Sequence, residues 1–261
     1  MTLRYLFAIL ALGVAGTTLL PAQTLPFIDP NFSGITQYDG WENLNAVAYP
    51  PPTYPHYTST DPFSIASNQP GSNGAMLNKV SGAGGPMDPD LGNYIYVFGG
   101  MSSDATVTTA SFSITDSAVV SGLQNVFLQT MMVGASTLPG GEYMEFSNGI
   151  FPVLNYNGGI QNLVATNTFY FGEIDVEGIG FGDGTIFHRG FQWDLSGILD
   201  PVTSIEITWN NSPHSQIYGV QLDQSDTYSV IPEPSVFALV FLALLCGVIC
   251  YRNRVLFSEK L

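Results

Sequence analysis

The chain is short of basic residues. Only six Lys and Arg stand against 21 Asp and Glu, which gives a net charge of -15 and an isoelectric point of about 4.1. Nucleic-acid backbones attract basic protein surfaces and repel acidic ones. This balance therefore excludes nucleic acid as a partner.

Cysteine is almost absent. The two cysteines, Cys246 and Cys250, lie four residues apart in an apolar run near the C-terminus, where thiols pack as small hydrophobic groups. The rest of the sequence has none, which excludes disulfides, thiolate metal sites and a cysteine nucleophile there.

Charged residues of either sign are also scarce. They make up 10% of the chain, which instead contains 28 Gly and 17 Pro. Exposed helices need Lys, Glu and Arg on their solvent face, whereas Gly and Pro favour turns. We therefore expect many short elements joined by turns, and no long helical architecture.

The N-terminus has the layout of a secretory signal peptide. Arg4 precedes an apolar run of about a dozen residues, which is short of the roughly 20 needed to span a membrane, and small or polar residues follow. We expect cleavage after Ala22, although Gly13 and Ala15 fit the small-residue rule for cleavage better. An uncleaved anchor is the alternative.

The C-terminus carries a second apolar segment, residues 235–251. At about 1.5 Å per residue it is long enough for a transmembrane helix of roughly 25 Å. Arg252 and Arg254 follow directly, and basic flanks of membrane spans stay in the cytoplasm. The bulk of the chain is therefore expected outside the inner membrane.

Pro232, Glu233 and Pro234 stand at the outer edge of this segment. Two prolines one residue apart keep the backbone extended and outside the helix. The tripeptide, the apolar helix and the Arg pair together resemble the PEP-CTERM sorting signal of exported proteins in many Gram-negative bacteria. The resemblance covers roughly the last 30 residues and implies recognition and cutting by the membrane enzyme exosortase. An ordinary C-terminal anchor is the alternative, and residues 255–261 make a longer tail than the family pattern.

Three parts follow from these signals: a signal peptide at 1–22, an exported domain at 23–230 and a sorting tail at 231–261. The exported part has two basic residues, Lys79 and Arg189, against 19 acidic ones, the 21 of the chain without Glu233 and Glu259. Its carboxylates have few salt-bridge partners, so they stay in water or bind divalent cations.

Short strands dominate the exported domain. Apolar residues alternate with polar ones at 112–114, 174–176 and 205–209, and continuous apolar runs at 94–98 and 126–128 predict more fully buried strands. In a last strand, we expect the side chains of Tyr218, Val220 and Leu222 to form one apolar face. Residues 71–92 are Gly-rich and are expected to be irregular. We predict an all-β fold, an antiparallel two-sheet sandwich of the jelly-roll type, between an N-terminal signal helix and a C-terminal transmembrane helix.

The sharpest local feature is an acidic strand. Glu173, Asp175 and Glu177 alternate with apolar residues, so all three carboxylates share one face at about 6.6 Å spacing. A solvated strand face explains them most simply. With Asp183 they are also candidate Ca²⁺ ligands, although no full Ca²⁺-loop pattern is present and no other cofactor is expected.

The five residues 173–177, Glu-Ile-Asp-Val-Glu, resemble the catalytic strand of family 16 glycoside hydrolases. The resemblance implies that Glu173 is the nucleophile and Glu177 the proton donor, as in retaining hydrolysis. The family's other aromatic cleft segments are not found in order in this chain.

Other chemistry has less support. The histidines have no zinc-binding spacing, and no nucleophile elbow, phosphate loop or dinucleotide fingerprint occurs. Trp41, Trp193 and Trp209 are candidates for a sugar-stacking platform, with core packing as the alternative. We therefore expect a non-catalytic envelope or extracellular-matrix protein, sorted by exosortase and transiently held by the membrane. A sugar- or Ca²⁺-binding module that contacts extracellular polysaccharide is the alternative, and a hydrolase is the third.

Overall fold

The computed structural model describes residues 27–46, 60–88, 92–98, 109–136, 143–176 and 184–231. The predicted signal peptide, the sorting tail from residue 232 onward and their two helices lie outside these residues. In the part of the chain that is described, no helix is long and apolar enough to cross a membrane.

The described residues form strands and a single turn of 3₁₀ helix at Ser147–Gly149, with no α-helix among them. This confirms the predicted all-β class. The strands in chain order are β1 (Thr36–Trp41), β2 (Phe63–Ala66), β3 (Met76–Ser81), β4 (Gly84–Pro86), β5 (Ile95–Val97), β6 (Ala110–Asp116), β7 (Asn125–Val133), β8 (Ala135–Ser136), β9 (Tyr143–Met144), β10 (Val153–Tyr156), β11 (Leu163–Val164), β12 (Asn167–Val176), β13 (Gly184–Asp194), β14 (Ile205–Asn211) and β15 (Gln216–Ser225).

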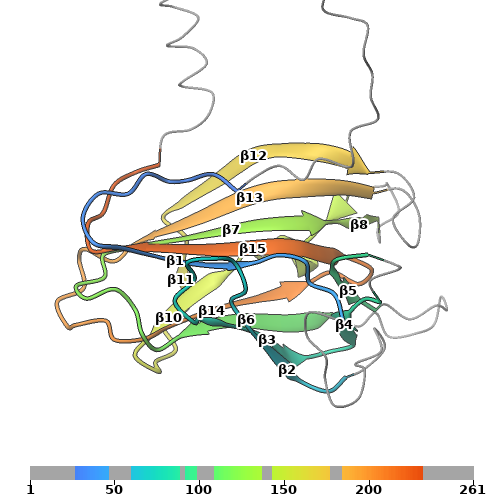
Figure 1. Cartoon of the computed structure of the whole chain (residues 1–261), viewed down its shortest axis with the longest axis horizontal. Helices are drawn as coiled ribbons and strands as arrows, with labels where there is room; N and C mark the ends of the chain where they lie inside the picture. The colour runs from blue at the N-terminus through green and yellow to red at the C-terminus, as the bar shows by residue number, and fades with distance from the viewer. Residues whose placement is uncertain are drawn as a thin grey trace, which may run out of the picture.

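Two antiparallel sheets contain most of these strands, as predicted. The seven-stranded sheet has the order β12-β13-β7-β15-β5-β4, and β1 pairs with β15 on the same side as β5. The six-stranded sheet has the order β11-β10-β14-β6-β3-β2. Figure 1 shows the two layers, with β12, β13, β7 and β15 above β14, β6 and β3. From β5 onward the chain passes back and forth between the sheets, so neighbours in the sequence seldom pair.

One hydrophobic core lies between the sheets. Period-two alternation turns Phe112 and Ile114 of β6 and Ile207 of β14 inward, where they meet Leu128 of β7 and Phe191 of β13. All five are nearly or fully inaccessible to solvent. Burial of apolar surface on this scale is the main term that stabilises a two-sheet fold.

Two local predictions are wrong. A bulge in β15 pairs Ile217 with Met132 but Gly219 with Met131, so Tyr218 is an extra residue. Val220 therefore shares the core with Ile217, while Tyr218 packs on the opposite face of the sheet. The Gly-rich stretch 71–92 contains β3 and β4, because its glycines lie at turns and at a sheet edge and do not interrupt the pairing.

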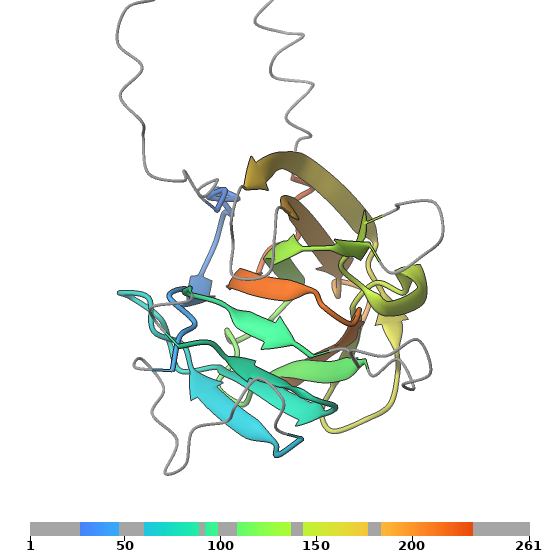
Figure 2. The same cartoon turned by 90° about the vertical axis from the view of Figure 1, so that its right-hand side faces the viewer.

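The face of the seven-stranded sheet that points away from the core, called here the outer face, is also covered. The segment 27–35 precedes β1 and places Phe27 against His188 and Phe32 against Phe127. Ile231, at the other end of the described chain, packs in the same cluster as Phe127 and Phe32. Both ends of the described chain therefore lie on the outer face. Figure 2 views the molecule from the right-hand end of Figure 1, with β12 at the top and the β2–β3 hairpin at the bottom.

Candidate ligand-binding cleft

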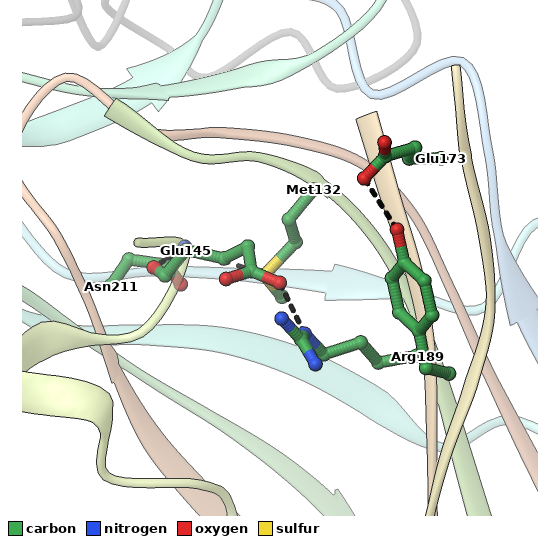
Figure 3. A network of polar contacts seen from close by, with 6 residues as sticks. Met132, Glu145, Glu173, Arg189 and Asn211 are labelled. Carbon is green, nitrogen blue, oxygen red and sulfur yellow. Dashed lines mark hydrogen bonds and ion pairs between the residues drawn. The ribbon is translucent and has the colours of Figure 1, made fainter. Parts of the chain in front are cut away.

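The predicted acidic strand is β12, an edge strand of the seven-stranded sheet. Its pairing shifts at Phe171, so that Tyr170 lies opposite Arg189 and Gly172 opposite His188. The bulge brings Glu173 to the same side as Tyr170, whose hydroxyl donates a 2.5 Å hydrogen bond to Glu173 Oε2 (Figure 3). Burial, then this hydrogen bond, raises the pKa of Tyr170 to about 12.

The other predicted acidic residues add little to this group. Asp175 is exposed and accepts a hydrogen bond of 2.8 Å from Thr185 Oγ1. Glu177 and Asp183 lie outside the described residues, and with them part of the candidate Ca²⁺ set and one member of the nucleophile–acid pair. Within the described ranges, no group of three His, Cys, Asp or Glu side chains is placed to hold a metal ion.

Arg189 lies beside the acidic strand and contributes to the packing of the sheet. Its guanidinium forms an ion pair with Glu145, and the rings of Tyr170, Phe151 and Phe187 lie within 6 Å of it. The backbone oxygen of Glu145 accepts a hydrogen bond from Asn211 of the six-stranded sheet (Figure 3). The pair thus ties the two sheets together.

The three tryptophans are core residues, so the stacking-platform alternative is wrong for them. Trp41, Trp193 and Trp209 are at most 4% exposed. Each indole N–H donates to a protein oxygen, as buried indoles usually do: to Ile65 O, Leu163 O and Asn211 Oδ1 respectively.

A cleft of about 870 Å³ lies between the segment 27–35, strand β1 and the adjacent part of β15. Its walls mix amides, carboxylates and aromatic rings with a few aliphatic and small residues. They come from Phe27, Asp29, Pro30, Asn31, Phe32, Ile35, Thr36, Gln37, Tyr38, Gly71, Asn73, Val120, Gln221, Asp223 and Gln224. A concave site of this size with a few placed polar groups is typical of ligand binding.

The segment 27–35 is held in place by side chains of the sheet. Gln129 of β7 accepts from Ile28 N at 2.9 Å and donates to Ile28 O at 2.8 Å, so its amide substitutes for the peptide group of a neighbouring strand. Further along, Ser225 Oγ donates to Ser33 O at 2.7 Å. One wall of the cleft is thereby fixed to the sheet.

Asp223 is the buried carboxylate of the cleft. Its side chain is 7% exposed and accepts hydrogen bonds from Gln221 Nε2 at 2.9 Å and Gln129 Nε2 at 3.4 Å. Burial raises its pKa to about 7, and the charges of Asp29 and Asp39 act in the same direction against the two amide bonds. A carboxyl in this state changes its charge readily when a ligand approaches.

The series of polar contacts that begins at Asp223 in the cleft continues across the sheet to His188. His188 Nε2 lies 3.2 Å from Gln129 Oε1, between the rings of Phe27 and Phe171. Burial lowers the pKa of His188 to about 4, so the imidazole is neutral at pH 7. His188, Gln129 and Asp223 therefore form one buried row across β13, β7 and β15.

The wall of the cleft on β1 and β15 is also organised by a carboxylate. Gln37 and Gln224 both donate their amide N–H groups to Asp116 Oδ2, at 2.8 and 2.6 Å. Asp116 comes from β6 of the other sheet, so the two glutamines are oriented from behind the cleft. Their amides thus point toward the six-stranded sheet, and Gln224 is fully buried, so this contact fixes the wall of the cleft.

Sequence reasoning did not find this cleft. Asp29, Tyr38 and Asp223 are distant along the chain, and each belongs to a segment with the pattern of an ordinary loop or strand. The only signal was the polar run at 221, 223 and 224 in the last strand, beside buried apolar residues.

No protein-family model matches the sequence, and no curated protein or solved structure is significantly similar to it. The functional argument therefore depends on the chain's own residues.

Proposed function

We propose that this chain is an exported, non-catalytic protein of the cell envelope or extracellular matrix, whose sandwich binds a glycan in the cleft. The cleft itself is the observation that carries this proposal. Amides of Gln37, Gln221 and Asn73 suit sugar hydroxyls, and the rings of Phe27 and Tyr38 suit the C–H faces of sugars.

Delivery to the envelope is the second part of the proposal. The signal peptide at 1–22 takes the chain through the inner membrane, and the apolar helix at 235–251 holds it there transiently. Exosortase then recognises the tripeptide Pro232, Glu233 and Pro234, and Arg252 and Arg254 keep the tail oriented. The order of these sequence signals supports this route.

We further propose that the exported domain, 23–230, is a jelly roll with a helix at each end of the precursor. Strands β5, β7, β13 and β15 lie in one sheet, and β6, β10, β11 and β14 in the other. The repeated passage of the chain between sheets supports this topology, which pairs strands across two Greek keys.

The described acidic strand favours binding over hydrolysis. Retaining glycosidases need an enclosed pair of carboxyl groups about 5 to 5.5 Å apart. Glu173 and Asp175 are exposed, and each is engaged by a hydroxyl group of the protein. The hydrolase that uses Glu173 and Glu177 remains the alternative that an assay must test.

Two measurements test this function. Screening the full-length chain against a glycan array should give binding that is lost when Gln221 and Asn73 are both replaced by Ala, and a silent array would remove the binding proposal. Mass spectrometry of the protein recovered from producing cells should show a C-terminus near Pro-Glu-Pro, and an end still at Leu261 would contradict processing.

A further inference from the structure

We propose that the cleft selects sugars that carry a free primary amine, so that its ligand is an amino sugar or a polymer of deacetylated amino sugars. This inference rests on the proposed glycan-binding function and names the chemical class that the same site takes. It depends on the charge, the polar groups and the shape of the cleft.

The charge of the cleft has one sign. Asp29 of the N-terminal segment and Asp223 of β15 both line it. Of the two basic residues in the described part of the chain, Lys79 and Arg189, neither lines it. An anionic sugar such as a uronate would thus bind without an opposite charge in the cleft. An ammonium group would instead meet two carboxylates.

Further carboxylates lie directly behind the walls. Asp116 binds the amides of the lining residues Gln37 and Gln224, and Asp226 accepts from the backbone N–H of the lining residue Ile35. Their negative potential adds to that of the cleft, since no described basic side chain is paired with them. A cation is attracted from outside the cleft as well as bound within it.

Asp223 has the environment of a carboxylate that lacks a cationic partner. Its side chain is almost fully buried, and its two hydrogen-bond donors are neutral amides. Burial holds its pKa near 7, so ionisation in the empty cleft is costly. A ligand ammonium beside it supplies the missing charge and favours the ionised form.

The remaining lining groups suit a sugar better than a bare metal ion. A Ca²⁺ ion takes six to eight oxygen ligands in a compact shell. Here two carboxylates line a space of about 870 Å³, and no metal-holding cluster of three acidic or histidine side chains occurs among the described residues. The half-buried rings of Phe27, Phe32 and Tyr38 give the same space apolar surfaces for stacking.

The test compares four probes on the full-length chain in mild detergent by titration calorimetry. They are glucosamine oligomers, N-acetylglucosamine oligomers of equal length, neutral glucose oligomers and CaCl₂. One charge-assisted contact contributes enough to make the amine-bearing oligomers bind about tenfold more tightly than either uncharged series. Asp223→Asn should remove that preference, while Asp200→Asn, the same charge change at an exposed site, should keep it.

A proton count adds a signature that a structural effect would not produce. At pH 7 the unaltered chain should release more protons on binding the amine ligand than Asp223→Asn does, measured as a dependence of binding heat on buffer ionisation, because only the unaltered chain has the Asp223 proton to lose. The groups that act on Asp223 are Asp29, Asp39 and Tyr38, together with the amides of Gln129 and Gln221, so Asp29→Asn should lower the affinity without abolishing proton release.

Three outcomes would overturn the inference. Equal affinity for charged and neutral oligomers would refute amine selection and leave glycan binding intact. Saturable Ca²⁺ binding that Asp223→Asn abolishes, with no preference for amines, would make the cleft a cation site. Failure of every oligomer to bind would remove the glycan-binding proposal together with this one.

Discussion

Gln129 and Asp223 lie on neighbouring strands, β7 and β15, and the amide of Gln129 donates to the carboxylate of Asp223 while pairing with the backbone of Ile28. The buried side chain of Gln129 thus binds both the N-terminal segment 27–35 and the carboxylate of Asp223 in the cleft. The position of the segment and the charge of the cleft are therefore linked.

The first prediction concerns this amide. Gln129→Ala removes both bonds to Ile28 and one to Asp223, and leaves buried polar groups without partners. We expect a loss of about 2–4 kcal/mol in the free energy of unfolding, and faster hydrogen exchange at the amide of Ile28. Urea unfolding and exchange by NMR measure the two effects.

The matched control is Gln161→Ala. Gln161 pairs in the same way with the backbone of Tyr156, accepting at 2.9 Å and donating at 3.2 Å, but it is exposed. Water can replace its bonds, so we expect a loss below about 1 kcal/mol. Equal losses in the two variants would show that Gln129 does not hold the segment as proposed.

The second prediction concerns pH. The pKa of Asp223 is about 7 in the folded state and close to 3.8 when unfolded, so the folded state keeps a proton between these values and loses relative stability as pH rises from about 4 to about 7. The pKa of His188 is about 4 when folded and close to 6.5 when unfolded, so its contribution rises with pH over about 4 to 6.5. The two groups oppose each other.

Single substitutions separate the two contributions. Relative to the unaltered chain, Asp223→Asn should gain stability as pH rises from about 4 to about 7, by on the order of a few kcal/mol, since each unit of pKa shift equals about 1.4 kcal/mol. His188→Gln should show the opposite trend over about 4 to 6.5. Melting temperatures across this range measure both, with Asp200→Asn as control, and curves parallel to that of the unaltered chain would refute the assignment.

The third prediction concerns a close approach on the outer face. A Cβ at Gly190 would lie 2.6 Å from Phe127 Cε2 and 2.7 Å from Phe171 Cε2. Both rings are packed, so Gly190→Ala should destabilise the fold by about 1–3 kcal/mol through overpacking. A Cβ at Gly197 would have no neighbouring atom within 4 Å, so Gly197→Ala should change the free energy of unfolding by less than about 0.5 kcal/mol. Denaturation midpoints of the two variants should therefore differ, and equal midpoints would contradict the packing.

The sequence predicted the strands better than the site, for a physical reason. Phe112, Ile114 and Ile207 belong to local patterns of alternating apolar and polar residues. Because burial of one face produces this pattern, each strand can be recognised from its own sequence. The bulges at Phe171 and Tyr218 change the face of every later residue in their strands. A glycine follows each bulge, Gly172 and Gly219, but a strand glycine alone does not show which residue is the extra one.

The cleft could not be predicted from the sequence because the residues that line it are far apart in the chain and come together only in the folded structure. Asp29 and Asp223 are brought together when the segment 27–35 lies across the sheet, and a buried Gln at position 129 holds it there. In the sequence, Gln129 is one polar residue in an apolar strand. Its role becomes apparent only through its partners on two other segments.

The last prediction concerns Glu173, which the resemblance to family 16 glycoside hydrolases made a candidate nucleophile. Because its side chain is exposed and bound to Tyr170, Glu173→Gln should change the free energy of unfolding by less than about 0.5 kcal/mol. It should lower the pKa of Tyr170 from about 12, since the hydrogen bond to Glu173 and its charge both raise that pKa, while burial and the opposing charges of Arg189 and Glu145 remain. Chemical-shift titration of the Tyr ring carbons measures this, with Asp175→Asn as the control that leaves Tyr170 unchanged. If the unaltered chain instead releases reducing sugar from a glycan, and Glu173→Gln abolishes that release, the strand is catalytic and the protein is a hydrolase.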